Sequence, residues 1–170
     1  MLIPESKVVD ADELLPVPEI IGEPLFIKIP EINLEAAIES VGLTETGSMD
    51  TPKLPMNTAW YNLGVRPGEI GSAVIDGHVN WKYGATAVFA NLDNVKVGDK
   101  VTVEDNNGKL IDFIVREIRT YQHDDDASDI FSSSDGKSHL NIITCAGAWN
   151  KNLKIYSERL VIFTDRIANS

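Results

Sequence analysis

The chain contains a single cysteine, Cys145, at the end of an apolar run in the stretch "NIITCAGAW", which spans residues 141–149. A cysteine acts as a nucleophile through its thiolate, and a thiolate forms where a base or a positive charge lies nearby. A buried, unreactive core cysteine has the same local pattern of apolar residues before it. Other residues in the chain must therefore distinguish these two interpretations.

Of the three histidines, His78 is the strongest candidate for the base or acid that a reactive cysteine needs. It follows an apolar run in "AVIDGHVNW", which is expected to be a strand that holds the ring rigidly, and Gly77 removes bulk beside it. His123 lies in an acidic stretch, and His139 begins the cysteine's own run and is expected to point elsewhere. The order of these residues along the chain sets no constraint, because base and nucleophile need only meet in space.

Arg159 is the candidate donor for an oxyanion. It follows Cys145 by fourteen residues, in the stretch "YSERLVIF", and a strand–loop–strand connection of that length would return it next to the cysteine. A guanidinium is always charged and presents several donors, which suits the stabilisation of a tetrahedral intermediate. The alternative is a surface arginine that forms an ion pair, with Glu158 beside it.

Two neighbours of the cysteine are candidates for substrate contacts. Thr144 directly precedes it and is expected either to orient a substrate or to pack beside the thiol. Trp149 follows four residues later and is expected either to line a substrate groove or to belong to the core.

The chain lacks the familiar motifs for metals, nucleotides and serine nucleophiles. We find no HExxH, GxxxxGK[ST], GxGxxG or GxSxG pattern. The acidic stretch "HDDDASD" (residues 123–129) lacks the glycine and the late glutamate of a calcium-binding loop. It is expected to be a solvated loop, with weak calcium binding as the alternative. We expect no metal and no cofactor, because side chains alone would supply the nucleophile, the acid and the oxyanion donor.

Composition limits the possible partners. The 170 residues include 15 basic and 26 acidic side chains, for a net charge of −11. This balance argues against nucleic-acid binding, which needs a basic surface, and would repel anionic membranes. One cysteine permits neither an internal disulfide nor a cysteine-based zinc site. No run approaches the roughly 18 apolar residues that span a bilayer, so either the protein is cytosolic or a membrane anchor lies outside this sequence.

The pattern of the remaining residues predicts an all-β fold. Residues 1–24 are acidic and contain prolines, and we expect a tail or stalk there, followed by a catalytic domain over residues 25–170. Residues 84–95 alone look helical, because Val88, Phe89 and Leu92 recur at helical spacing. Seven or eight strands with one or two short helices indicate a closed barrel or a sandwich. The predicted strands lie within residues 25–29, 34–43, 72–81, 100–105, 109–118, 139–146 and 159–167.

These motifs together resemble the sortase family. "NIITCAGAW" followed by "YSERLVIF" is similar to the sortase pattern in which TLxTC ends one strand and an arginine opens the next. "GSAVIDGHVNW" resembles the strand with the sortase histidine, and "AWYNLGVRPGEIGSAVIDGHV" is most similar to class F sortases. The resemblance extends over residues 25–167, and it departs from TLxTC at Asn141 and Ile142.

The resemblance implies a closed sortase-type barrel and a monomeric cysteine transpeptidase at the extracellular face of the membrane. Its substrate would be a C-terminal sorting signal of the LPxTG type on a secreted protein. The Cys145 thiolate would attack the threonine carbonyl, Arg159 would stabilise the oxyanion, and His78 would protonate the departing amine. An amine of the cell envelope or a pilin-like lysine would then accept the acyl chain.

Three alternatives remain open. An L,D-transpeptidase is also a β-rich cysteine enzyme, but it expects a His-Gly-Cys-x-Arg cluster, whereas Ala-Gly-Ala follows Cys145. A catalytically weak or hydrolytic sortase relative would keep the same three residues. A non-catalytic β-barrel module would bind sorting peptides without cleaving them.

Overall fold

The computed structural model describes residues 18–168 and contains, within them, eight strands, one short α-helix and three short 3-10 helices. The α-helix is α1 (Ser128–Phe131), and the 3-10 helices are η2 (Pro30–Ile32), η3 (Lys82–Gly84) and η4 (Leu92–Asn94). The strands are β1 (Pro24–Ile29), β2 (Leu34–Val41), β3 (Thr58–Tyr61), β4 (Gly71–Gly77), β5 (Lys100–Asp105), β6 (Leu110–Gln122), β7 (Ser138–Asn150) and β8 (Ile155–Arg166).

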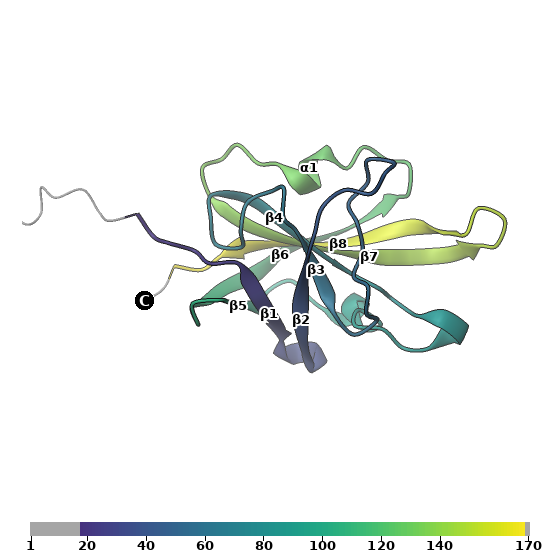
Figure 1. Cartoon of the computed structure of the whole chain (residues 1–170), viewed down its shortest axis with the longest axis horizontal. Coiled ribbons are helices and arrows are strands. Elements are labelled where there is room, and N and C mark those ends of the chain that lie inside the picture. Colours follow the sequence, from purple (N-terminus) through teal and green to yellow (C-terminus); the bar gives the residue numbers. More distant parts are fainter. Residues whose placement is uncertain (1–17, 169–170) are drawn as a thin grey trace, which may run out of the picture.

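The strands form one closed barrel in the order β1-β2-β3-β4-β7-β8-β6-β5. The pairs β2–β3 and β4–β7 are parallel, and the other pairs are antiparallel. Figure 1 shows the β7–β8 hairpin projecting from the barrel on the side opposite the N-terminal segment. The predicted all-β closed barrel of seven or eight strands is confirmed.

Alternating side chains fill the barrel. In β5, for example, Val101 and Val103 are fully buried, while the residues between them are partly exposed. Because successive side chains of a strand point to opposite faces, this alternation places one set inside and the other outside. The other inward-facing residues include Ile27, Ile29, Ile75, Ile111, Phe113, Leu140, Ile142 and Ile162.

A second, smaller core lies on the outer face of the sheet, beneath α1. Its buried residues are Val74, Tyr121, Ile130, Val161 and Phe163. The buried side chain of Asn141 fastens α1 to the sheet, since its Nδ2 donates to the carbonyl of Ile130 at 2.7 Å. The loop that carries α1 therefore forms a wall over the outer face of β4, β7 and β8.

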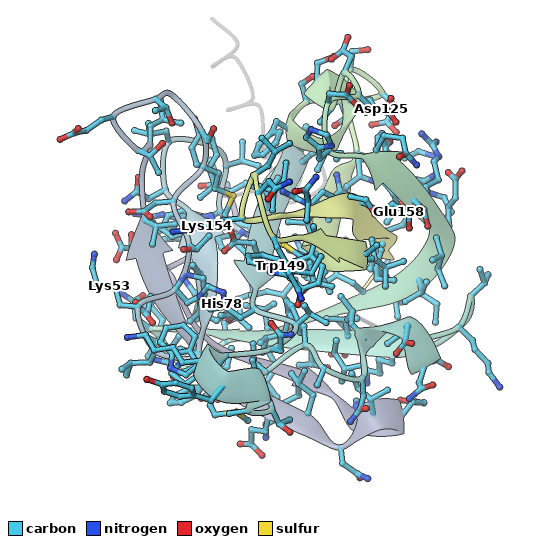
Figure 2. All side chains as sticks on the ribbon, turned by 90° about the vertical axis from the view of Figure 1, so that its right-hand side faces the viewer. Lys53, His78, Asp125, Trp149, Lys154 and Glu158 are labelled. Carbon is cyan, nitrogen blue, oxygen red and sulfur yellow. The ribbon has the colours of Figure 1, made fainter. Side chains whose placement is uncertain are left out.

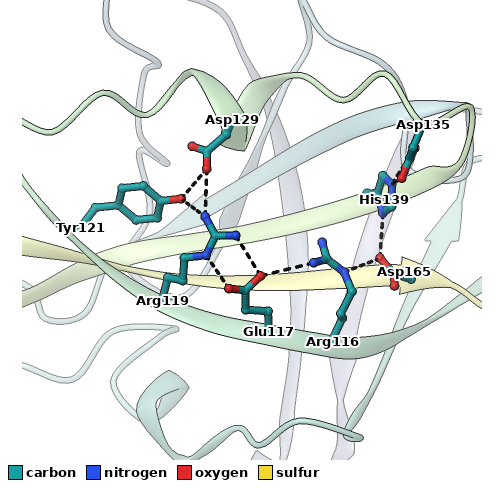
Figure 3. Close-up of polar contacts among 8 residues, drawn as sticks. All are labelled: Arg116, Glu117, Arg119, Tyr121, Asp129, Asp135, His139 and Asp165. Carbon is teal, nitrogen blue, oxygen red and sulfur yellow. Dashed lines mark hydrogen bonds and ion pairs between the residues drawn. The ribbon is translucent and has the colours of Figure 1, made fainter.

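Ion pairs and hydrogen bonds tie the same loop to the sheet (Figure 3). Arg119 of β6 donates to Asp129 of α1 at 3.0 Å. The buried ring of His139 lies between Asp165 of β8 and Asp135 of the loop, at 2.7 and 2.8 Å. His139 is thus part of this network rather than of the thiol site.

The prediction of a helix over residues 84–95 is wrong. The structure has turns there, with 3-10 geometry over residues 92–94 alone. The Val88 and Phe89 amides donate to the distant carbonyls of Pro55 and His78, at 2.9 Å each. The side chains of Val88, Phe89 and Leu92 are nevertheless buried in the core. Their spacing therefore reflects closure of the barrel rather than a helical period.

Three strands are longer than expected, and the first of them, β6, ends at residue 122 rather than at residue 118. β7 continues past Cys145 to residue 150, and β8 begins at residue 155 rather than at Arg159. The register shifts between Ala146 and Trp149, where Gly147 has a φ of 76°. This irregularity hides the extension in the sequence, because it breaks the period-2 alternation. β3 was also missed, since it has only four residues.

The end of the predicted N-terminal tail packs on the barrel. Ile21 is buried in the main core, and Glu19 forms hydrogen bonds with Arg166 at 2.7 Å. The Gly22 amide donates to Asp105 at 2.8 Å. Residues 1–17 of that segment lie outside the described residues.

Candidate active site

The three residues expected to be catalytic lie on the outer face of three neighbouring strands. Cys145 of β7 is directly paired with Arg159 of β8. In the parallel pair of β4 and β7, Asp76 is opposite Ile143, and continuing this register by two residues places His78 beside Cys145. His78, Cys145 and Arg159 lie an even number of residues from Val74, Ile143 and Val161, respectively, whose side chains point outward. The three side chains therefore leave the sheet on the same side.

Two large cavities meet at these residues. The first, here called the helix-side cavity, has a volume of about 540 Å³ and is bounded by the α1 loop. The second, the hairpin-side cavity, has a volume of about 720 Å³ and is bounded by residues 79–84 and the β7–β8 hairpin. The residues common to both linings are His78, Cys145 and Arg159. In Figure 2, which faces the hairpin, His78, Trp149 and Lys154 lie together near the centre.

His78 is held from several sides. Its Nε2 lies 2.8 Å from the Pro52 carbonyl oxygen, and because a carbonyl only accepts, Nε2 carries a proton in this arrangement. The ring also contacts Trp81 edge-on, with centroids 5.0 Å apart. The His78 carbonyl accepts from the Phe89 amide at 2.9 Å. Within residues 18–168, Nε2 is the ring nitrogen of His78 that has a hydrogen-bond partner.

Cys145 is partly buried and has no disulfide partner. Burial raises the pKa of its thiol above the ordinary value, and the carboxyl of Asp76 raises it further. The guanidinium of Arg159 opposes this and lowers the pKa of the thiol. The thiolate therefore depends on the positive charge across the β7–β8 pair.

Arg159 is oriented by its own strand. Its Nη1 donates to the carbonyls of Tyr156 and Glu158, at 3.1 and 2.9 Å. These bonds fix one corner of the guanidinium, so its position is set before a substrate arrives. A donor held in place beside the nucleophile is what oxyanion stabilisation requires.

The two residues expected to contact substrate have different surroundings. Thr144 is buried, and its hydroxyl donates to the Gly77 carbonyl at 2.7 Å, linking the strands of Cys145 and His78. Trp149 is 50% exposed on the hairpin, with its ring centroid 5.1 Å from that of Tyr156. Thr144 lines the helix-side cavity and Trp149 lines the hairpin-side cavity.

The sequence interpretation missed one ionisable residue of the site, Asp76. It lines the helix-side cavity together with His123. Its position two residues before His78, on the same face of one strand, was the available signal.

No cluster of metal-ligating side chains occurs within residues 18–168. In the acidic loop, Asp125 accepts from the Gln122 amide at 2.7 Å and Asp126 from the Ser128 amide at 2.9 Å. These carboxylates thus stabilise turns of the loop.

Comparison with known proteins identifies the family. The model of the sortase domain matches residues 27–167. The chain belongs to the sortase family. It is therefore a cysteine transpeptidase, a class of enzyme that acts at the bacterial cell surface, and Cys145 is its one cysteine. No curated protein sequence matches this sortase.

Solved structures agree with this fold. Sortase C1 from Streptococcus agalactiae matches with a TM-score of 0.67 and 26% identity, over 86% of this chain and 68% of that one. Sortase A from Corynebacterium diphtheriae matches with a TM-score of 0.68 and 21% identity, over 89% and 63%. Sortase C from Clostridium perfringens SM101 matches with a TM-score of 0.63 and 23% identity, over 88% and 73%.

The matched sortases belong to classes A and C, so these matches leave the class F resemblance unconfirmed. Over residues 18–168, no helix has both the length and the apolar character needed to cross a bilayer.

Proposed function

We propose that this sortase cleaves an LPxTG-type sorting signal and transfers the acyl part to an amine. The Cys145 thiolate attacks the carbonyl carbon of the threonine–glycine bond, and the negative charge moves to the carbonyl oxygen beside Arg159. The carbon–nitrogen bond then breaks, His78 gives a proton to the leaving amine, and a thioester remains on Cys145. An incoming amine attacks this thioester, gives a proton back to His78 and forms the new amide bond as the carbon–sulfur bond breaks, which releases the Cys145 thiolate.

This proposal rests on one observation: two cavities have the same three residues in their linings. A transpeptidase needs one approach to the nucleophile for the acyl donor and another for the acceptor. The helix-side and hairpin-side cavities have His78, Cys145 and Arg159 in common. A donor in one cavity and an acceptor in the other would both reach the sulfur.

The helix-side cavity suits the apolar start of a sorting signal. Most of its wall is apolar, and a leucine–proline pair gains free energy when such surfaces exclude water. The apolar residues that line it are Leu43, Met49, Tyr61, Ala127, Phe131 and Ile143. Thr144 lies in the floor of this cavity beside the nucleophile.

The hairpin-side cavity would then receive the amine acceptor. Its wall includes the polar side chains of Asn80, Lys82 and Lys154, and the half-exposed Trp149 also lines it. In this arrangement Trp149 contacts the acceptor rather than the sorting signal. The acceptor is an amine of the cell envelope or a pilin-like lysine, and the reaction takes place at the extracellular face of the membrane.

The class F subtype is also part of this proposal. It rests on the stretch from Ala59 to Val79, in which a tryptophan and a Pro-Gly-Glu turn precede the Gly-His-Val segment. The indole of Trp60 donates to the Val65 carbonyl at 3.0 Å, and Glu69 accepts from the Arg66 amide at 2.7 Å. Both motif residues thus have defined structural roles.

A peptide assay tests the function. The protein is incubated with a fluorogenic LPxTG-type peptide, with and without a glycine amine, and the thioester on Cys145 is sought by mass spectrometry. We expect cleavage and a covalent adduct with the parent protein, and neither with Cys145→Ala. Equal cleavage by the two proteins would exclude Cys145 as the nucleophile. A product that never contains the added amine would identify a hydrolytic sortase.

Arg159 is tested separately. Arg159→Ala is expected to lower kcat by about 10²-fold or more if the guanidinium stabilises the oxyanion. Arg159→Lys keeps the charge but loses the forked donors, so an intermediate rate is expected. Arg116→Ala is a matched control, since Arg116 pairs with Asp165 in the ion-pair network of Figure 3. An unchanged rate for Arg159→Ala would assign Arg159 a structural role.

A further inference from the structure

Asp76 occupies an unusual place beside the nucleophile. It lies in β4, two residues before His78, so both side chains leave the sheet on the same face. Across the parallel β4–β7 pair it is opposite Ile143, which is itself two residues before Cys145. Asp76 and Cys145 therefore lie on adjacent strands, one pleat apart, in the lining of the helix-side cavity.

The carboxyl of Asp76 has an unfilled hydrogen-bonding position. Its Oδ1 is buried and has no hydrogen-bond partner within residues 18–168. A buried polar atom without a partner costs about 1–3 kcal/mol, and such atoms are rare in native proteins. Because Asp76 lines the helix-side cavity, a group of a peptide bound there is the natural partner of its carboxyl.

The groups around Asp76 determine which partner it accepts. Burial raises the pKa of Asp76 well above its ordinary value, and the nearby Asp50 and Glu39 carboxylates raise it further. The other titratable groups on the same cavity are Tyr61, His78, His123, Cys145 and Arg159. Burial favours the neutral carboxyl of Asp76, which both donates and accepts a hydrogen bond. A hydroxyl does the same, whereas an acidic side chain would place a second carboxyl group beside Asp76.

We infer that Asp76 is a specificity-determining residue of the helix-side cavity, where its carboxyl hydrogen-bonds the side-chain hydroxyl of the residue whose carbonyl Cys145 attacks. The hydroxyl oxygen lies two bonds from the Cα of the reacting residue, and Asp76 lies one pleat from Cys145. The hydroxyl can therefore reach the Asp76 carboxyl while the carbonyl of the same residue lies at the Cys145 sulfur. A peptide with valine at this position has the same shape but leaves the Asp76 carboxyl buried and unpaired. The inference rests on the proposed function, because it assumes a sorting peptide in this cavity.

The test compares two substrates across matched variants. Peptides of the LPxTG type that carry threonine or valine before the cleaved bond are assayed for kcat/KM. We expect the parent protein to prefer threonine by at least about 10-fold, since a site built for a hydroxyl discriminates against its absence. Asp76→Ala should reduce this preference to about 3-fold or less. Asp76→Asn should keep most of it, because the amide also donates and accepts.

Asp99→Ala serves as the matched control. Asp99 does not line the helix-side cavity, and it accepts from the Lys96 amide at 2.8 Å. Its loss should leave the threonine preference unchanged. A purely structural effect of Asp76→Ala would lower kcat/KM for both peptides by the same factor, which would overturn the inference.

Binding provides an independent measurement. In the Cys145→Ala background, the affinities for the threonine and valine peptides are measured by fluorescence anisotropy with and without Asp76→Ala. A threonine preference that is the same in both backgrounds overturns the inference while the proposed function stands. If the parent protein cleaves neither peptide and the Cys145→Ala background binds neither, the proposed function fails together with the inference.

Discussion

The substitution Gly77→Ala tests whether close packing beneath the site positions His78. Gly77 ends β4 directly before His78. A Cβ at this position would lie 2.5 Å from Phe89 Cδ2 and 2.8 Å from Val88 Cγ1. Both side chains are at least 90% buried, so neither can swing into solvent. The backbone of the β4 end or of the Val88–Phe89 turn must therefore shift.

The size of the effect follows from these contacts. Overpacking a filled core costs about 1–3 kcal/mol, and 1 kcal/mol lowers Tm by roughly 2–4 °C in a domain of this size. The shift also reaches the site, because the Phe89 amide donates to the His78 carbonyl and Thr144 donates to the Gly77 carbonyl. A displacement on the order of 1 Å at a catalytic group costs about 10²-fold in rate. We therefore expect kcat/KM to fall by roughly 10- to 100-fold.

Gly42→Ala is the matched control for this experiment. A Cβ at Gly42 would meet only Asn62 Oδ1, at an ordinary 3.7 Å. Thermal unfolding and peptide cleavage are measured for both variants. Equal Tm values for the two variants would refute the packing argument. A lower Tm for Gly77→Ala with an unchanged kcat/KM would refute the link from this packing to His78.

Two further predictions concern ionisable groups. Because burial raises the pKa of the Cys145 thiol, alkylation by iodoacetamide should speed up about tenfold per pH unit between pH 7 and 9; a plateau below pH 8 would contradict this. Arg159→Ala should move the profile to higher pH, since Arg159 lowers that pKa. Hydrogen bonds from Arg166 and Lys109 lower the pKa of Glu19 to about 2, from 4.5. Its stabilising effect should therefore be complete above about pH 5 and vanish as the pH falls toward 2. Urea unfolding of Glu19→Gln should show a deficit below about 1 kcal/mol at pH 7, because the pair is solvent-screened, and a deficit that persists at pH 2 would contradict the assignment.

The sequence was sufficient for features that depend on local alternation. The strands around Val101 and Ile111 alternate cleanly, and the separation of fourteen positions from Cys145 to Arg159 corresponds to one hairpin. The position of His78 at the end of an apolar run was enough to place it at the end of β4. Each of these inferences needs only the period of a strand and the length of a connection.

Features that depend on distant partners were not predictable in the same way. The Val88 and Phe89 amides donate to the carbonyls of Pro55 and His78, outside their own segment, and no local pattern distinguishes this apolar spacing from that of a helix. α1 contains four residues and is held by Asn141 from another strand. The unfilled acceptor on Asp76 is likewise defined by what surrounds it in space, and no local pattern marks it.

In the proposed reaction, the Cys145 sulfur and then the substrate's carbonyl oxygen carry a negative charge, and Arg159 stabilises both. Before attack, the negative charge is on the sulfur of Cys145, where burial disfavours it and Arg159 favours it. During attack, the charge moves to the carbonyl oxygen, which is bonded to the same carbon that the sulfur approaches. In the proposed reaction, a guanidinium fixed by the Tyr156 and Glu158 carbonyls would stabilise both thiolate and oxyanion without moving. Stabilisation by a donor that needs no reorganisation is the efficient form of electrostatic catalysis, and direct cross-strand pairing of Cys145 with Arg159 is how this barrel provides it.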